Sequence, residues 1–537
     1  MGKKDPADKT PFYLDEAGIF GLSLATALNK RDYKVTVFDQ NRYDESGYAP
    51  SFDSKVQAAS VDHNKIFRAS YGKKIHYQRL ALEGRRGWES INDSLGDDDD
   101  GPLFVNSGML RVQPDDHLGA LERETLASME RDGVRHTQFV KSIPEDVERA
   151  RHLGWSSKLL DVAIPDKSPS GKTFEAVLDS LAGFIRCSDA CNYLLKRASA
   201  DGVTFHLGPE EGCFQSLVEE DGDGSGDGRK AIGLRTKDGI FHRADVVVIA
   251  GSFANQPPPF SSPPPPPPPP PQPRSPRRGL TRKPFTSAGS FSTQLLPELA
   301  YHLESSAGSL ATFKIDRSDE ALWQKYSPEQ FPVITWKSAP RRQDGTDTGS
   351  VYVLPRTPDG LVKIGYRGIK VPPLSPPSDA FLFTNFQPAP DGASFAQHGM
   401  WSVPLSPAES RRIHGDSVHA IRQFVSIFLP DFAKQEFHST KMCWYTDSLD
   451  NSFLIDYVPR YSDKSVFVCT GGSGHGAKFL PVLGEHAADI LEHGNESSSY
   501  MRPHWRWRDD IPRGNGLDEG PEGPRNIGNV TDPSANP

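Results

Sequence analysis

The sequence predicts an α/β (α+β) protein, in which a Rossmann-like domain is joined to a second domain built on a mixed or antiparallel β-sheet. Residues 17–40, AGIFGLSLATALNKRDYKVTVFDQ, run from a glycine-bearing turn through an apolar helix to a strand. Residues 442–484 place two apolar runs before a glycine-rich turn and a helix. Residues 311–402 alternate strand-like runs with proline-rich loops, which favours an antiparallel sheet.

The N-terminal stretch forms half of a dinucleotide-binding βαβ unit. In such a unit a helix start holds the pyrophosphate, and an acidic residue about 20 positions later binds the ribose hydroxyls. Gly18, Gly21 and Asp39 have this spacing. Glu16 stands where the first glycine is expected, and the preceding strand, PFYLD, is short and weakly apolar. Because a carboxylate there repels a pyrophosphate, we expect weakened dinucleotide binding or an N-terminus that is not the true one. An ordinary amphipathic helix and strand is the alternative.

The glycine-rich turn of residues 471–476 follows an apolar run and opens a helix. Glycines let backbone amides approach a ligand closely, and the amides and dipole of a helix start favour negative charge. An anionic cofactor is therefore the predicted ligand, with a plain tight turn as the alternative. The apolar run Val246–Ala250 is followed directly by a glycine, which is typical of a buried central strand.

Charge and composition exclude several classes of function. The net charge of −9 offers no basic face for nucleic acid. No run reaches the roughly 20 apolar residues that span a bilayer, and the N-terminus lacks a signal-like apolar region. Five scattered cysteines without CxxC spacing predict neither disulfides nor a zinc site. The acidic segment 221–228 has Ile232 where a calcium loop needs glutamate, so we expect a hairpin tip and no bound metal.

Residues 256–284 form a proline-rich segment with nine consecutive prolines. Such a tract is extended and solvated, so it lies outside any core. The tetrapeptide AGSF precedes it at 250–253 and follows it at 288–291, and deletion of one copy with everything between restores a continuous strand, turn and helix. We interpret the segment as an insertion, either a retained intron or a surface loop. A ligand for an SH3 or WW domain is the functional alternative.

Other charged and polar positions have ordinary structural interpretations when taken alone. Lys65 and Arg68 are three positions apart, which on a helix would place both on one solvated face. Cys187 and Cys191 are one helical turn apart and are expected to be buried small side chains. A charged helix is predicted near 118–132, and another helix over 408–428.

In this order, the motifs resemble the sarcosine oxidase and fructosyl amino acid oxidase (amadoriase) family of FAD-dependent amine oxidases, which have a D-amino-acid-oxidase-like fold. The resemblance covers most of residues 17–490 outside the insertion. It rests on AGIFGLS with FDQ, NKIFRASYG, VKIGY, CWYTDSLDNSFLID and GGSGHGAKFLPVLG. The departures are Glu16, the weak first strand and the insertion.

The resemblance implies a bound FAD whose ADP half lies on Gly18, Gly21 and Asp39. It also implies a thioether between Cys443 and the flavin, for which a thiolate attacking an electron-poor ring is reasonable chemistry. The remaining residues implied to bind the cofactor are Lys65, Gly472, Gly474, His475, Gly476 and Lys478, of which the glycine turn would face the flavin pyrimidine edge.

Three cations are implied in catalysis. Lys363 matches a flavin-facing lysine that promotes the reaction with oxygen, since a cation stabilises the negative charge that forms there. Arg68 and Lys478 match a pair that binds the substrate carboxylate, for which a guanidinium fork is well suited. Arg367 stands where sarcosine oxidases have a histidine, which implies a different amine pocket.

The resemblance also implies the organisation and function of the chain. The predicted domains are an FAD-binding domain (10–95, 169–255, 431–492), a substrate domain (96–168, 288–430), a disordered proline-rich insertion (256–287) and a polar tail (493–537). The expected activity is oxidation of a secondary amine bearing a carboxylate, an N-alkyl or N-glycated amino acid, with release of hydrogen peroxide. The alternative is a degenerate member that binds flavin poorly and acts as an interaction protein through its proline tract.

The expected partners are a small-molecule amine and oxygen, without nucleic acid or membrane, and the expected state is a monomer. A cytoplasmic location is predicted, because the C-terminus SANP is not an SKL-type peroxisomal signal.

Overall fold

A computed structural model of the chain describes residues 11–50, 56–96, 101–165, 171–220, 228–250, 296–336, 350–367, 383–388, 399–448, 450–509, 521–523 and 526–529. The insertion predicted at 256–287 lies outside the described residues, as do most of the acidic hairpin tip at 221–228 and residues 510–520 of the predicted tail. Within the described ranges, no helix combines the length and apolar content that crossing a membrane requires.

A six-stranded sheet has the strand order β22-β23-β13-β1-β2-β9. Neighbouring strands are parallel except β22 and β23, which are antiparallel. The strands are β1 (Pro11–Asp15), β2 (Lys34–Asp39), β9 (Thr204–Leu207), β13 (Val246–Ile249), β22 (Leu454–Tyr457) and β23 (Val466–Thr470). The weakly apolar PFYLD lies in the middle of the sheet as β1, because the burial of Phe12 and Leu14 anchors it.

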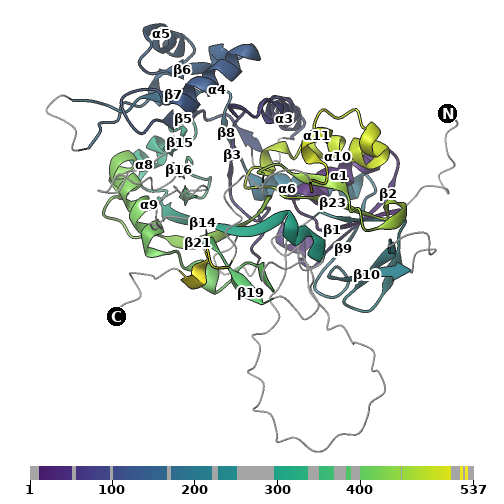
Figure 1. Cartoon of the computed structure of the whole chain (residues 1–537). Coiled ribbons are helices and arrows are strands. Elements are labelled where there is room, and N and C mark those ends of the chain that lie inside the picture. Colours follow the sequence, from purple (N-terminus) through teal and green to yellow (C-terminus); the bar gives the residue numbers. More distant parts are fainter. Residues whose placement is uncertain are drawn as a thin grey trace, which may run out of the picture.

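Each face of this sheet has its own covering layer (Figure 1). One face packs against α1 (Ile19–Lys30), α6 (Cys187–Ala200) and α10 (Leu483–His493). The other face packs against the antiparallel sheet of β10 (Phe214–Glu220), β11 (Lys230–Thr236) and β12 (Phe241–Arg243). Parallel strands covered on both faces are typical of Rossmann-like folds. This part of the predicted fold is confirmed.

A second, nine-stranded sheet has the order β18-β14-β17-β16-β15-β5-β7-β6, with β21 also paired to β14. β15 and β5 are parallel and the other described pairs are antiparallel. The strands are β5 (Met109–Val112), β6 (Gln138–Val140), β7 (Ala176–Asp179), β14 (Leu303–Lys314), β15 (Val333–Trp336), β16 (Val351–Val353), β17 (Leu361–Tyr366), β18 (Phe383–Thr384) and β21 (Ser439–Ser448). Helix α9 (Gly415–Phe428) packs Ile421 and Phe424 into the core of this sheet. The predicted mixed sheet is confirmed.

The remaining elements lie outside the two large sheets. Two small antiparallel sheets contain β3 (Lys65–Phe67), β8 (Gly183–Ile185) and β4 (Phe104–Val105), and β19 (Phe386–Pro388) with β20 (Met400–Ser402). The other helices are α2 (Tyr43–Ser46), α3 (Ile75–Asp93), α4 (Ala120–Arg131), α5 (Pro144–His152), α8 (Glu320–Lys325) and α11 (Arg502–Trp505). The 3-10 helices are η2 (Arg135–Thr137), η3 (Ser156–Lys158), η4 (Pro297–Tyr301), η5 (Glu409–Arg411), η6 (Pro430–Phe432), η7 (Ser462–Lys464), η8 (Ala477–Phe479), η9 (Gly494–Glu496) and η10 (Ile527–Asn529).

Several local predictions are wrong. Lys65 begins strand β3 and Arg68 follows it, so the two cations do not share a helix face. The helix predicted over 408–428 divides into η5 and α9. The turn at 471–476 does open a helix as predicted, but this is the short 3-10 helix η8, and α10 begins only at Leu483.

The tail predicted from 493 onward is packed in its first part. Met501 and Trp505 are fully buried, and the Trp505 indole nitrogen donates to the Tyr77 hydroxyl at 3.1 Å. Local polarity suggested disorder, but a few aromatic side chains suffice to dock a short segment on an existing core. The boundaries predicted for the domains stay predictions.

Candidate active site

A cavity of about 890 Å³ lies between the carboxyl ends of the parallel strands and the nine-stranded sheet. Ligands of open α/β sheets bind at the carboxyl ends of the strands, which makes this cavity the candidate active site. From the six-stranded sheet it is lined by residues that directly follow strands, Glu16, Ala250 and Gly471, and from the nine-stranded sheet by Tyr352, Lys363 and Tyr445.

Glu16 adopts a glycine-like backbone conformation at one end of the cavity. Its φ is +106°, which for a residue with a side chain costs roughly 1–2 kcal/mol. A Cβ at Gly21 would lie 1.9 Å from the Glu16 carbonyl oxygen, and one at Gly18 would lie 2.4 Å from a Glu16 carboxylate oxygen. The side chain of Glu16 therefore lies against Gly18, at the start of α1 and on the predicted pyrophosphate site.

Asp39, at the end of β2, is buried beside the same turn. Its carboxylate accepts hydrogen bonds from the backbone of Ala17 at 3.0 Å and from the backbone and side chain of Asn41 at 2.8 and 2.9 Å. Burial raises the pKa of Asp39 to about 6, although these hydrogen bonds act in the opposite direction. Nearby, the Tyr43 and Tyr48 rings stack with centroids 3.9 Å apart.

In the middle of the cavity, Asp62 joins two lysines. One carboxylate oxygen lies 2.8 Å from Lys65 Nζ, and the other lies 2.8 Å from Lys363 Nζ. Lys363 also donates to the Asn64 carbonyl. Asp62 and Lys363 are buried and belong to segments more than three hundred residues apart, so only the fold brings them together. We refer to Asp62, Lys65 and Lys363 as the Asp62 cluster.

In the Asp62 cluster, ion pairing favours the charged forms of side chains that burial disfavours. Burial opposes ionisation of Asp62, but the ammonium groups of Lys363 and Lys65 outweigh it and lower the pKa of Asp62. Burial likewise opposes the charge on Lys65, and Asp62 outweighs it and raises the pKa of Lys65. The pKa of Lys363 is lowered, because burial exceeds the support that Asp62 gives. One carboxylate can neutralise only one of the two ammonium groups. With both lysines protonated, the cluster therefore carries a net positive charge.

A second group of cations, Arg68, Arg367 and Lys478, lines the same cavity. Lys478 Nζ donates to the Tyr71 hydroxyl at 3.1 Å, and the Arg68 guanidinium lies 4.6 Å from the centre of the Tyr71 ring. Burial, followed by the charges of Arg68 and Arg367, holds the pKa of Lys478 well below its usual value. We refer to these three residues as the cation group.

The glycine turn at 471–476 lies against both Arg367 and Phe20. Gly474 has φ +67°, and a Cβ there would lie 2.3 Å from the Arg367 guanidinium. A Cβ at Gly476 would lie 2.5 Å from the Phe20 ring. His475 Nδ1 lies 3.1 Å from the Tyr71 hydroxyl. The glycines therefore permit close packing around the cavity wall.

Cys443 lies on β21, opposite Gly308 of β14, and is buried. Burial, Cys443 and Tyr352 together raise the pKa of the neighbouring Tyr445 well above its usual value. The same thiol contributes electrostatically to Lys65. Cys443 is therefore beside the Asp62 cluster, although it does not line the cavity itself.

The structure brings most of the predicted site residues to one cavity. Its lining includes Lys65, Arg68, Lys363, Gly472, Gly474, His475, Gly476 and Lys478. Gly18, Gly21 and Asp39 lie beyond Glu16 and do not line it. Sequence reasoning missed Asp62, Tyr352 and Asp447. The signal for Asp62 was its place three positions before Lys65 and two positions before the start of the NKIFRASYG motif.

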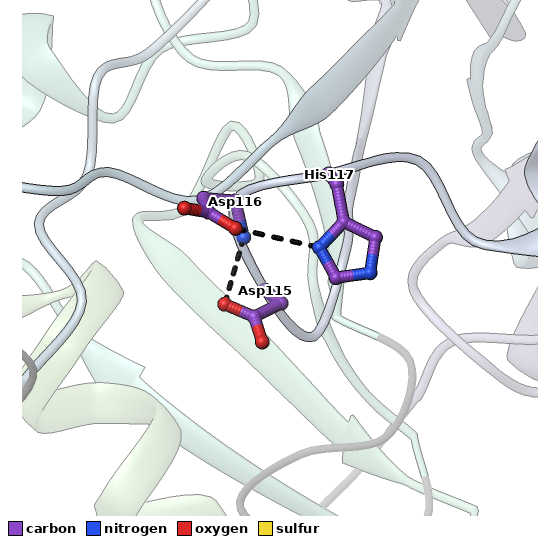
Figure 2. A group of neighbouring side chains, drawn as sticks. All are labelled: Asp115, Asp116 and His117. Carbon is purple, nitrogen blue, oxygen red and sulfur yellow. Dashed lines mark hydrogen bonds and ion pairs between the residues drawn. The ribbon is translucent and has the colours of Figure 1, made fainter.

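A separate group of potential metal ligands, Asp115, Asp116 and His117, lies on a loop outside the cavity (Figure 2). His117 Nδ1 is 3.3 Å from an Asp116 oxygen, and the other Asp116 oxygen pairs with Lys172. Asp116 and His117 are exposed. An exposed acidic loop whose carboxylate already pairs with an ammonium is ordinary surface structure.

An open α/β sheet with a glycine turn at its first helix and a cavity at its carboxyl edge is the architecture of dinucleotide-dependent enzymes. The family model described as FAD dependent oxidoreductase (DAO) matches residues 17–282 and 285–490. The chain therefore belongs to the FAD-dependent oxidoreductase family, and the resemblance drawn from its motifs is confirmed.

The similar proteins span most of the chain. L-saccharopine oxidase of Schizosaccharomyces pombe is 24% identical over 496 residues, which is 92% of this chain and 92% of that protein. N-methyl-L-tryptophan oxidase of Salmonella typhimurium is 24% identical over 446 residues, 81% and 84% of the two chains. A modified fructosyl peptide oxidase from Aspergillus nidulans has a TM-score of 0.66 at 23% identity and covers 95% of each chain. Amadoriase II from Aspergillus fumigatus has a TM-score of 0.61 at 20% identity, with 94% and 91% covered.

The residues present fit FAD unequally at the two ends of the site. If the flavin ring occupies the cavity, Lys65 and the glycine turn suit a flat ring system that gains negative charge. At the other end, the Glu16 carboxylate lies against Gly18 where a pyrophosphate would meet the helix start. Binding of FAD there requires the Glu16 side chain to rotate away or to be protonated.

Proposed function

We propose that this protein is an FAD-dependent oxidase of a secondary amine that carries a carboxylate, an N-alkyl or N-glycated amino acid. The amine loses two electrons and two protons from its C–H and N–H bonds, the resulting imine is hydrolysed by water to a carbonyl compound and an amine, and oxygen takes up the electrons and protons as hydrogen peroxide. The observation that carries this proposal is the meeting of the Asp62 cluster and the cation group in one cavity.

FAD, when bound, would supply the two-electron chemistry that no side chain provides. Gly18, Gly21 and Asp39 would hold its ADP half, and Lys65 with the glycine turn would hold its ring. Cys443 would form the thioether. The last assignment is supported by the position of Cys443 beside the Asp62 cluster and by its CWYTD motif.

Lys363 would stabilise the negative charge that develops as oxygen is reduced. Its position supports this role, because it is buried, aimed at the cavity and held by a single carboxylate that it shares with Lys65. A cation in a water-poor site is worth several kcal/mol to a forming anion, which is about 10²–10³ in rate.

Arg68 and Lys478 would bind the substrate carboxylate. The Arg68 guanidinium and the Lys478 ammonium face the same Tyr71 ring, at 4.6 and 5.0 Å from its centre. Burial is the main cause of the lowered pKa of Lys478, and the charges of Arg68 and Arg367 add to it. A bound carboxylate would reverse this effect and restore the charge on Lys478.

The relatives favour this oxidase over the alternative of a non-catalytic interaction protein. Their names are those of oxidases of saccharopine and N-methyl-L-tryptophan, both secondary amines with a carboxylate. The proline tract on which the alternative depends lies outside the described residues.

The test begins with the purified full-length chain. Its visible spectrum should show bound flavin, and the pellet after acid precipitation should be yellow if Cys443 carries the cofactor. Peroxide release should then be screened over sarcosine, pipecolate, saccharopine and fructosyl amino acids. A colourless acid pellet would exclude the thioether alone, whereas a protein without flavin and without peroxide release would exclude the oxidase. Subcellular fractionation and size-exclusion chromatography test the predicted cytosolic location and monomeric state.

A further inference from the structure

Arg367 gives the cavity a third cation at its substrate end. It directly follows β17, and its guanidinium lies 4.6 Å from the centre of the Tyr445 ring. One terminal nitrogen is 3.4 Å from the Ser473 carbonyl oxygen, and the other is 3.6 Å from Asp447 Oδ1. Among the described residues, Nε and Nη2 of Arg367 have no hydrogen-bond partner. Both of these nitrogens are buried, and Arg367 lines the cavity, so its guanidinium brings to the cavity wall a positive charge whose hydrogen bonds are only partly satisfied.

Asp447 only partly neutralises the charge of Arg367. Its carboxylate accepts a hydrogen bond of 2.5 Å from the Ser306 hydroxyl, and the separation of 3.6 Å from Arg367 is longer than a hydrogen-bonded ion pair. The absence of a side chain at Gly474 allows the guanidinium to approach the glycine turn. The fold therefore makes room for this arginine beside the cavity.

The charges at the substrate end do not balance without a ligand. With Lys478 protonated, the state that a bound carboxylate favours, the cation group contributes three positive charges, and Asp447 contributes one negative charge. The Asp62 carboxylate is engaged by Lys65 and Lys363. At the cavity mouth Lys73 pairs with Glu124 at 3.9 Å, and Lys74 donates to main-chain carbonyls. Two positive charges of the cation group therefore remain to be matched by an anion.

We propose that the substrate carries two carboxylates, one on each side of the secondary amine, as in an N-(carboxyalkyl) amino acid. Arg68 and Lys478 bind the first carboxylate, and Arg367 binds the second. This inference rests on the proposed function and specifies its substrate class. A substrate with one carboxylate leaves one cation unmatched in a site of low dielectric constant, which is costly. A substrate with two carboxylates neutralises both of the remaining positive charges.

Calorimetric titration of the purified full-length protein tests the second carboxylate with two thioethers that lack the oxidisable amine. Methylthioacetate and thiodiacetate differ by one carboxylate. We expect thiodiacetate to bind about 30-fold more tightly or better, because a charged hydrogen-bonded pair contributes that much. Equal affinities of the two thioethers would overturn the inference.

Substitution of the arginine locates the effect. Arg367→Met should reduce the ratio of the two affinities about 30-fold, and Arg367→Lys should restore part of it. Lys73→Met, which removes a cation at the mouth of the cavity, should leave the ratio unchanged. A ratio that Arg367→Met does not alter would also overturn the inference, and if that variant fails to fold, the wild-type ratio and Arg367→Lys decide.

Turnover separates this inference from the proposed function. Iminodiacetate differs from N-methylglycine by one carboxylate, and its oxidation with oxygen and water yields glycine, glyoxylate and hydrogen peroxide. We expect a kcat/KM for iminodiacetate at least about tenfold higher. Oxidation of both amines without discrimination would refute the second carboxylate and leave the oxidase intact. Discrimination between the thioethers without any amine oxidation would refute the oxidase and leave the binding site intact.

Discussion

The two groups of cations in the cavity differ in how the protein meets their charge. In the Asp62 cluster, Lys65 and Lys363 share one buried carboxylate at 2.8 Å each. In the cation group, three cations have one carboxylate near them, at 3.6 Å from Arg367. Cations fixed by a carboxylate are positioned before any ligand arrives, whereas cations that repel one another are prepared to receive an anion. The difference indicates a permanent role for the first group and a substrate-binding role for the second.

The largest expected effect concerns the Asp62 cluster. Lys363→Met should lower the rate of oxygen reaction of the reduced enzyme about 10²–10³-fold, because the charge that stabilises reduced oxygen is lost. Stopped-flow mixing of reduced enzyme with oxygen measures this rate. Lys34→Met removes an exposed lysine from β2 and serves as the matched control. An unchanged rate of oxygen reaction in Lys363→Met would show that the Asp62 cluster does not promote this reaction.

Asp62→Asn should break the cluster itself. Removal of one partner of a buried ion pair leaves Lys65 and Lys363 facing one another, which costs about 3 kcal/mol of unfolding free energy. Without Asp62 the pKa of Lys363 should fall further, so the oxygen reaction should decline at a lower pH than in the wild type. Urea unfolding and the pH profile of the oxygen rate measure the two effects. Asp62→Glu should recover part of both, and a pH profile that stays in place would contradict the assigned role.

The cation group should respond to pH in its binding of anions. The pKa of Lys478 is lowered by burial and by Arg68 and Arg367, so Lys478 is charged below that pKa and neutral above it. Binding of methylthioacetate should therefore weaken as pH rises, by up to about tenfold per pH unit above the pKa of Lys478. It should also take up protons, which calorimetry in buffers of different ionisation enthalpy detects. Lys478→Met should abolish the proton uptake, and uptake that persists in this variant would point to another group.

The smallest expected effect lies outside both groups, at the far end of the cavity. Glu16→Gly relieves the backbone strain at φ +106° and removes the carboxylate from the start of α1. We expect a flavin content severalfold higher and an unfolding free energy about 1 kcal/mol higher. Glu16→Ala removes the carboxylate but keeps a Cβ, so it separates repulsion from strain. If neither variant changes the flavin-to-protein absorbance ratio, Glu16 does not limit cofactor binding.

The sequence alone determined the fold class and the order of the motifs. Glycine spacing, apolar strands of fixed length and an acidic residue at a strand end are local features, because each depends on a few neighbouring backbone conformations. These features identified Gly18, Gly21 and Asp39 as candidates before any tertiary contact was known, and the resemblance of the motifs to a known family added Lys363 and Cys443. They also indicated that Glu16 takes a glycine position, and its φ bears this out.

Only the tertiary structure decided which charges meet. Asp62 and Lys363, or Arg367 and Asp447, are far apart in the chain and become neighbours because β3, β17 and β21 surround one cavity. Helical periodicity misassigned Lys65 and Arg68 to one helix face, since a strand of three residues is too short to show its alternation. The sequence therefore pointed to most of the cations of the site, and long-range packing, which sets distance and burial, brought in the carboxylates of Asp62 and Asp447 and decided how the charges are paired.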